Sequence, residues 1–208
     1  MRGERAQIIV IGGGPAGSAT ATLLARAGLD VVLLDRRRFP RDKPCAEYLS
    51  PACEDVLQRL GALERLERLG LRRVRGMTLI SKSGRRCIIE YNDGGRPRNA
   101  LTIPRLQLDH VLLELARAAG VDVRESISVR GPLLEGRRVA GVHALGPQPD
   151  VEHEIVADVV IGADGRMSVL ASALGLRRPV RWPRRLGLVT HYVMLDLPDG
   201  TGEMYVGR

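Results

Sequence analysis

A glycine-rich turn between two apolar runs is the feature that most constrains the fold of this chain. The β-branched run Gln7–Ile11 leads into three consecutive glycines, and the apolar run Val31–Leu34 ends on Asp35. Such runs predict buried parallel strands. Between them, small and apolar residues recur at helical spacing, and Gly28 is placed to end the helix. The expected buried face of this helix is Ala16, Ala19, Thr20, Leu23, Leu24 and Ala27. The sequence therefore predicts a β-α-β unit.

The turn itself has the pattern of a dinucleotide site. Gly12, Gly14 and Gly17 form G-x-G-x-x-G, in which the first glycine permits the turn, the second admits a pyrophosphate and the third allows close packing of helix and strand. The pyrophosphate would meet free N–H groups at the positive end of the helix dipole. Asp35 is positioned to accept hydrogen bonds from both ribose hydroxyls, and its charge disfavours the 2′-phosphate of NADP. NAD and FAD both satisfy this pattern, as would a unit that has lost its ligand.

Composition excludes several other classes of protein. The chain has 208 residues and a net charge of +8, carried almost entirely by arginines scattered along it, and no basic block resembles a nucleic-acid-binding module. We therefore expect no nucleic-acid partner. Cys45, Cys53 and Cys87 suit neither a disulfide framework nor a zinc site, so we expect no metal and a cytoplasmic location. No apolar run approaches the length of a membrane span.

A second glycine-flanked acid follows a later apolar run. Residues 159–162 read as a buried strand, Asp164 stands between Ala163 and Gly165, and Ser168 precedes a short helical pattern. An aspartate at a strand end beside glycines suits contacts to a cofactor's pyrophosphate or ribityl chain. An ordinary Asp-Gly turn with a helix cap is the alternative.

Five segments together resemble a known superfamily. They are GGGPAG at 12–17, Asp35-Arg36, FPRDKPCAEYLSP at 39–51, IPRLQLDHVLLELARAAG at 103–120 and GADG at 162–165. In order and spacing the chain resembles the N-terminal portion of FAD-dependent oxidoreductases of the geranylgeranyl reductase and group A flavin monooxygenase superfamily. The KPC segment is most similar to the geranylgeranyl reductase branch and its halogenase-like relatives.

The resemblance implies an α/β fold. It comprises a Rossmann-like FAD-binding domain, with a parallel sheet and a β-meander, and the beginning of an antiparallel substrate-domain sheet. We assign residues 1–70 and 101–178 to the FAD-binding domain and residues 71–100 and 179–208 to a partial substrate domain. The expected elements include a hairpin of Met77–Ile80 and Cys87–Tyr91, a meander turn at residues 135–137, and strands around a turn at residues 198–200.

The resemblance also implies the roles of individual residues. Around the FAD diphosphate it places Gly12, Gly14, Pro15, Ala16 and Gly17. It implies that Asp35 holds the adenosine ribose, that Arg36 and the backbone of Val129 contact adenine, and that Arg105 and Asp164 reach the phosphate or ribityl region. Cys45 is the candidate on the substrate side of the flavin.

The chain departs from the family pattern at three places. The two residues after Cys45 are commonly glycines in the reductase branch but are Ala46 and Glu47 here. The arginine expected a few residues after Ser168 is replaced by the sequence Leu170-Ala171-Ser172, and no second Gly-Asp motif follows residue 165.

The implied function is FAD-dependent reduction of isoprenoid double bonds, with NAD(P)H as a candidate external reductant. The substrate would be a small hydrophobic molecule, and peripheral membrane contact is compatible with it. A flavin monooxygenase, a halogenase-like enzyme, a truncated FAD-binding remnant without activity and an NAD-binding domain stay as alternatives. No histidine or acid in the sequence stands out as a catalytic acid or base.

Overall fold

The computed structural model describes residues 4–146, 152–178, 186–192 and 200–207. The chain divides into two compact units, which we call the first unit (residues 1–42 and 108–186) and the second unit (residues 43–107 and 187–208). Residues 43–107 of the second unit are thus inserted in the sequence of the first unit, and residues 187–208 follow it. We assigned residues 43–70 and 101–107 from the sequence to the FAD-binding domain. In the structure they group with the second unit. These units are compact groups of contacts and do not test function, so the domain assignment of these residues stays a prediction.

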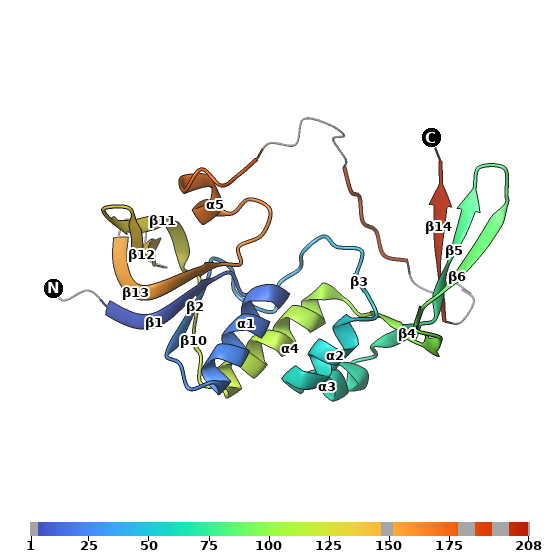
Figure 1. Ribbon diagram of the computed structural model, residues 1–208, viewed down its shortest axis with the longest axis horizontal. Coiled ribbons are helices and arrows are strands. Elements are labelled where there is room, and N and C mark those ends of the chain that lie inside the picture. The colour runs from blue at the N-terminus through green and yellow to red at the C-terminus, as the bar shows by residue number, and fades with distance from the viewer. Residues whose placement is uncertain (1–3, 147–151, 179–185, 193–199, 208) are drawn as a thin grey trace. The chain divides into compact units, whose positions relative to one another are not determined.

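A six-stranded sheet forms the centre of the first unit, with the strand order β10-β2-β1-β13-β12-β11 (Figure 1). Four neighbouring strands run parallel, and β12 and β11 extend the sheet as an antiparallel meander. The strands are β1 (Glu4–Ile11), β2 (Val31–Asp35), β10 (Asp122–Glu125), β11 (Ser128–Glu135), β12 (Arg138–Leu145) and β13 (Glu152–Gly162). This confirms the predicted Rossmann-like sheet and its meander.

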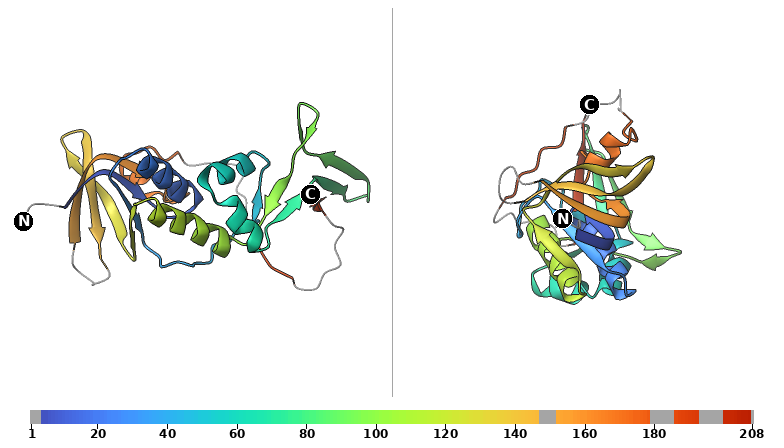
Figure 2. Two further views of the ribbon diagram at one scale, coloured as in Figure 1. Left: turned by 90° about the horizontal axis from the view of Figure 1, so that it is seen from below. Right: turned by 90° about the vertical axis from the view of Figure 1, so that its left-hand side faces the viewer.

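Helices cover this sheet on both faces. Helices α1 (Pro15–Arg26) and α4 (Arg105–Ala118) lie side by side in both views (Figures 1 and 2), and α1 together with the part of α4 after residue 107 packs on one face. The core on this face comprises Ile8, Val10, Ala21, Val31, Leu33, Leu113, Ala116 and Val121. Helix α5 (Val169–Ala173) and the meander enclose the core on the opposite face. Ile9, Ile11, Val32 and Leu34 point into this core, and along β1 and β2 they alternate with the residues that point into the first core. Both faces of β1 and β2 are therefore buried, as their uninterrupted apolar runs require.

Of the predicted buried face of α1, Leu24 packs against the core, but the fully buried positions lie elsewhere on the helix. Ala16 and Leu23 are exposed, whereas the buried positions are Gly17, Ser18, Ala21 and Thr22. Ser18 and Thr22 tolerate burial because their hydroxyls donate to the carbonyl oxygens of Gly13 (3.1 Å) and Ser18 (2.7 Å). The helix therefore packs on the sheet through its smallest side chains. Its end agrees with the prediction, because Gly28 follows the helix at φ +84°.

The small buried face of α1 generates a first prediction. Ala21→Leu should lower the free energy of unfolding by about 1–3 kcal/mol, because the added atoms must enter a packed core at a residue with no exposed surface. Leu23→Ala is the matched control on the predicted but exposed face, and it should cost less than about 1 kcal/mol. Chemical denaturation followed by circular dichroism measures both, and equal losses would contradict the observed orientation of α1.

Among its described residues, the second unit contains two short helices and three small sheets. Its helices are α2 (Cys53–Leu60) and α3 (Leu63–Arg68), which bury Leu57, Leu60 and Leu66. The sheets have the strand orders β3-β9-β4, β14-β5-β6 and β7-β8. Their strands are β3 (Tyr48–Leu49), β4 (Arg72–Val74), β5 (Gly76–Ser81), β6 (Arg86–Glu90), β7 (Asn92–Asp93), β8 (Arg96–Pro97), β9 (Ala100–Thr102) and β14 (Thr201–Val206).

The hairpin of β5 and β6 confirms the predicted one, but its third strand differs from expectation. Strand β14 pairs with β5 in parallel, so this sheet is mixed rather than purely antiparallel. Of the predicted turn at residues 198–200, only Gly200 lies among the described residues, and it has φ +77°. Ile88 on β6 and Tyr205 on β14 are 68% and 71% exposed. The outer strands of this sheet thus carry uncovered apolar side chains.

Candidate cofactor-binding site

The three motif glycines have different surroundings in the first unit. A Cβ on Gly17 would lie 1.8 Å from the carbonyl oxygen of Gly12, and a Cβ on Gly12 would lie 2.6 Å from that of Ala163. Gly12 also has φ +102°. These two glycines therefore allow β1, α1 and the end of β13 to meet. Gly14 is different, because the nearest atom to a Cβ there is Arg41 Nη2, at 3.7 Å. The space before Gly14 is open.

The start of α1 beside this space carries an uncompensated positive partial charge. Gly14 is the N-cap residue, Pro15 begins the helix, and no side chain caps it. The first turn contains no acidic residue. Since the first N–H groups of a helix lack intrahelical partners, those of Ala16 and Gly17 are available to an anion. Open space and free donors coincide at the predicted diphosphate position.

Asp35 lies at the end of β2 and is only 7% exposed. Its Oδ2 accepts a hydrogen bond from the backbone N–H of Gly13 (2.7 Å), and its Oδ1 accepts one from that of Arg37 (2.8 Å). Each carboxylate oxygen can accept more than one hydrogen bond, so both can still receive ribose hydroxyls. The sequence predicted the ribose contact alone. The structure adds that Asp35 also holds the glycine turn.

Asp164 lies just beyond the end of β13 and has one satisfied and one unsatisfied oxygen. Its Oδ2 accepts from the backbone N–H of Val169 at 2.7 Å, while Ser168 Oγ accepts from that of Ala171 at 3.1 Å, so both side chains cap α5. Asp164 Oδ1 is buried without a hydrogen-bond partner. A buried carboxylate oxygen is costly unless something donates to it. A cofactor hydroxyl, or a water bound to its phosphate, fits this need, so the residues of the first unit suit FAD.

Two further predicted contacts belong to the first unit. Arg36 is exposed and directly follows Asp35, which leaves its side chain accessible to an adenine ring. The side chain of Val129 is buried in the core beneath the meander, and its backbone pairs with Ala144 of β12. Neither arrangement tests a contact with adenine, and both roles stay predictions.

Cys45 and Arg105 belong to the second unit, where Glu47 connects them. The backbone N–H of Arg105 donates to Glu47 Oε1 (3.1 Å), and Glu47 Oε2 lies 2.9 Å from His191 Nε2. Burial raises the pKa of the Cys45 thiol, but hydrogen bonds from the Glu47 N–H and the Arg105 side chain outweigh burial, so the pKa falls below its ordinary value. Cys45 therefore has more thiolate character than an ordinary cysteine.

Glu47, at a position that is commonly glycine in the reductase branch, has an unusual backbone conformation. Glu47 has φ +54°, in the left-handed region that glycine adopts most readily. Its carboxylate accepts the Arg105 N–H, and its carbonyl oxygen accepts that of Ile103 at 3.3 Å. These bonds hold a conformation that a side chain otherwise disfavours. A residue other than glycine is thus held in the left-handed conformation here.

Arg41 is a candidate site residue that sequence reasoning missed. Its Nη1 lies 3.3 Å from Oδ2 of Asp109 on α4, and its guanidinium lies 4.6 Å from the centre of the Phe39 ring. The available signal was Asp109, an acid on a helix face shared with Leu112 and Leu113. A carboxylate on an apolar face requires a buried partner, and the FPRDKPC segment contains an arginine that can supply it.

Two other tests of the described residues concern metals and membranes. In the described part of the chain, no group of three or more histidine, cysteine, aspartate or glutamate residues is arranged to hold a metal ion. Among the helices that the structure describes, none is long and apolar enough to cross a membrane.

Taken together, the fold of the first unit and its glycine turn at residues 12–17 define a dinucleotide-binding α/β unit. A family model described as "FAD binding domain" matches residues 5–191. The chain belongs to this family of FAD binding domains, which confirms the resemblance and the predicted cofactor, FAD. The roles of the individual site residues stay predictions.

Known proteins with related sequences include a reductase and a halogenase. Menaquinone reductase of Mycolicibacterium smegmatis is 38% identical over 175 residues, which cover 82% of this chain and 40% of the relative. Tryptophan 2-halogenase of Chondromyces crocatus is 31% identical over 166 residues, which cover 80% of this chain and 31% of the relative. The chain therefore spans two-fifths or less of the length of these relatives.

Solved structures with the same fold include the following two. A myxobacterial chondrochloren halogenase matches with a TM-score of 0.72 and 32% identity, covering 82% of this chain and 39% of that one. A geranylgeranyl bacteriochlorophyll reductase-like protein from Thermoplasma acidophilum matches with a TM-score of 0.74 over 98% of this chain and 51% of that one. Its identity is 21%, so this second likeness shows the fold alone.

The different surroundings of Gly14 and Gly17 generate a second prediction. Gly14→Ala should fold and lower FAD affinity about tenfold, because its methyl group enters open space that the diphosphate would occupy. Gly17→Ala should lower the free energy of unfolding by at least about 1–3 kcal/mol, because its methyl group meets the Gly12 carbonyl. Thermal melts and FAD titration separate the two effects. A Gly14→Ala chain that binds FAD normally would contradict the proposed diphosphate position.

The contacts of Cys45 generate a third prediction. In a background with Cys53 and Cys87 changed to serine, Arg105→Gln should raise the pKa of Cys45, because a group that stabilises the thiolate is removed. At a fixed pH near 7 the thiolate fraction falls, and alkylation by iodoacetamide slows. The pH dependence of the alkylation rate measures the shift, with Arg65→Gln as a control on α3.

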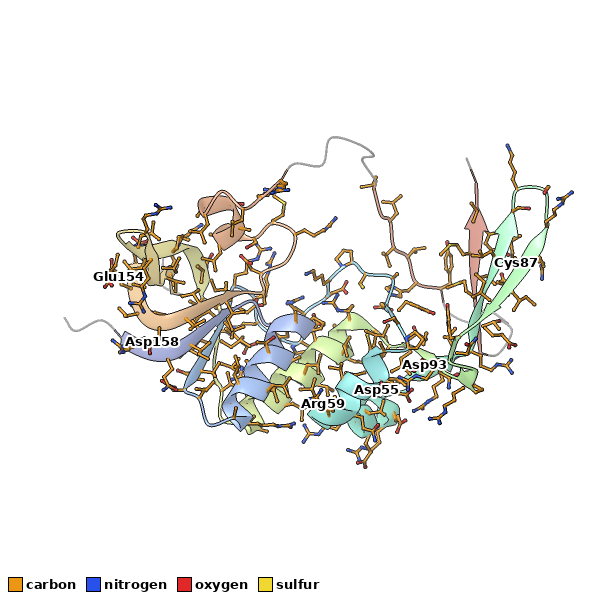
Figure 3. All side chains as sticks on the ribbon, viewed as in Figure 1. Asp55, Arg59, Cys87, Asp93, Glu154 and Asp158 are labelled. Atoms are coloured by element: carbon orange, nitrogen blue, oxygen red, sulfur yellow. The ribbon has the colours of Figure 1, made fainter. Side chains whose placement is uncertain are left out.

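A cysteine within the same chain offers an internal reference for this measurement. Cys87 lies on β6 and is exposed (Figure 3). Restored alone in place of Cys45, it should alkylate with an unchanged pH profile when Arg105 is replaced. A shift of the Cys87 profile, or none for Cys45, would show that Arg105 does not act on Cys45 directly.

Proposed function

We propose that this chain forms the FAD-binding part of an oxidoreductase that reduces a substrate with an isoprenoid chain. The observation that carries the proposal is the 38% identity to a menaquinone reductase over 82% of the chain. The KPC segment of the geranylgeranyl reductase branch, present here as Lys43-Pro44-Cys45, supports the same choice. The substrate would be small and hydrophobic, NAD(P)H would be the external reductant, and the protein would work in the cytoplasm.

Residues of the chain would bind and orient the cofactor. When bound, FAD supplies the hydride chemistry that the protein side chains lack. The N–H groups of Ala16 and Gly17 would contact the diphosphate across the open space before Gly14. Asp35 would accept the ribose hydroxyls, and the unpaired Asp164 Oδ1 would accept a hydrogen bond from the ribityl region or from a phosphate-bound water. Cys45, with its stabilised thiolate, would face the substrate side.

A halogenase or monooxygenase is the second candidate. The 31% identity to a tryptophan 2-halogenase and the 32% identity to the chondrochloren halogenase favour it. The replacement of the reductase-branch glycines by Ala46 and Glu47 points the same way. A third candidate is an FAD-binding remnant without turnover. Uncovered Ile88 and Tyr205 agree with this third candidate.

The fourth prediction concerns cofactor binding and product. The purified chain, incubated with FAD and desalted, should show a flavin absorbance spectrum, which Asp35→Ala should abolish because the ribose acceptor is lost. With NAD(P)H added anaerobically, the chain should convert menaquinone or geranylgeranyl diphosphate into a product that carries two additional hydrogens, detectable by mass spectrometry. The experiment is run again with air, tryptophan and chloride.

The outcomes separate the candidates. Products that gain oxygen or chlorine only in air support the monooxygenase or halogenase and contradict the reductase. Bound FAD with no product under any condition supports the remnant. If the chain shows a normal thermal melt, and is therefore folded, but never retains FAD, the proposed function is contradicted.

A further inference from the structure

A buried ion pair lies beside the motif turn, and the predicted site makes no use of it. The side chain of Asp109 has no exposed surface, and that of Arg41 is 14% exposed. Arg41 Nη1 and Asp109 Oδ2 are 3.3 Å apart. Both residues belong to the first unit. Removing two charges from water is costly, and such a pair is weak evidence for stability alone. A buried acid paired with an arginine therefore calls for a reason other than stability.

The position of Arg41 supplies that reason. Its Nη2 is the atom that a Cβ on Gly14 would approach, at 3.7 Å, so the guanidinium borders the open space at the start of α1. The Phe39 ring lies 4.6 Å from the guanidinium carbon, and the backbone N–H of Phe39 is held by Glu125 Oε1 at 2.6 Å. Asp109 on one side and the Phe39 ring on another thus fix where the positive charge of Arg41 lies.

We propose that Asp109 is a positioning residue that holds the Arg41 guanidinium against Gly14, where it clamps the cofactor diphosphate. This inference rests on the proposed binding of FAD. A guanidinium has five N–H donors, so the pair with Asp109 leaves donors for phosphate oxygens. An arginine already held in place loses little conformational freedom on binding, and a partly desolvated charge attracts phosphate more strongly than a solvated one.

The charges around the turn explain why such a clamp is needed. Asp35 and Asp164 both lie near the turn, since the Asp35 carboxylate bonds to Gly13 and Asp164 follows the Ala163 carbonyl that contacts Gly12. A diphosphate brought between these acids meets repulsion that the partial charge of one helix end offsets only in part. Arg41 supplies a full positive charge at the same place. The carboxylate of Asp109 offsets part of the positive charge of Arg41, but it also fixes the position of the guanidinium.

The experiment measures binding of ADP and of adenosine to the same 208-residue chain. Asp109→Asn keeps the shape of the side chain and removes its charge. It should weaken ADP and FAD binding about tenfold, equivalent to about 1.4 kcal/mol, and leave adenosine affinity unchanged. A merely structural defect would weaken both ligands. Calorimetry measures ADP and FAD, and saturation-transfer NMR measures adenosine. The matched control on α4 is Glu114→Gln, an exposed partner of Arg117, which should change neither affinity.

A double-mutant cycle tests whether Asp109 acts through Arg41. Arg41→Gln should also weaken ADP binding, and adding Asp109→Asn to it should cause no further loss. Asp109→Glu, which restores the charge, should recover part of the ADP affinity. If Asp109→Asn does not fold, Arg41→Lys carries the test, because it keeps a charge but loses the planar donors and should selectively weaken ADP.

Three results would overturn the inference while leaving FAD binding intact. They are wild-type ADP affinity in Asp109→Asn, tighter ADP binding in Asp109→Asn, or an equal loss from Asp109→Asn with and without Arg41. Tighter binding would mean that the carboxylate acts only as an opposing charge. A wild-type chain that binds neither ADP nor FAD contradicts the proposed function, and the inference fails with it.

Discussion

The contact between two glycines is the constraint on which the first unit depends. A side chain on Gly17 would lie 1.8 Å from the Gly12 carbonyl oxygen, so the first turn of α1 can approach the end of β1 only without one. Gly12 in turn lies against the carbonyl of Ala163, beyond the end of β13. Two neighbouring parallel strands therefore end, and one helix begins, at the same point. The free helix N–H groups, Asp35 and Asp164 are gathered there because the backbones can come so close.

Acidic side chains have two different functions around this point. The carboxylate of Asp35 accepts hydrogen bonds from the backbone N–H groups of Gly13 and Arg37. Asp164 caps α5 through one oxygen, and its other oxygen has no hydrogen-bond partner. Both therefore maintain the shape of the site and leave acceptors for a ligand. Asp109 faces Arg41 from a position with no exposed surface. The first two acids are suited to contact a ligand, and the third is suited to hold a cation.

The sequence predicted the parts of this arrangement that depend on local pattern. The glycine spacing, the apolar runs and the terminal Asp35 gave the β-α-β unit, and Glu135-Gly136-Arg137 gave the meander turn, because each signal lies within a few residues. The buried face of α1 could not be found by counting apolar residues, since Ser18 and Thr22 satisfy their hydroxyls on nearby carbonyls. The Arg41–Asp109 pair and the parallel pairing of β14 with β5 join distant segments, which no local pattern encodes.

The central position of β1 in its sheet determines when the site can form during synthesis. One neighbour of β1 is β2, about twenty residues later, but the other is β13, and Ile8 pairs with Val159. A ribosome must therefore make residues 43–107 of the second unit and the meander before β1 acquires its second neighbour. Until then the glycine turn lacks Ala163 and Asp164, which pack against Gly12 in the folded unit. A nascent chain thus carries the complete motif in its first thirty-five residues long before it has a place for the ligand.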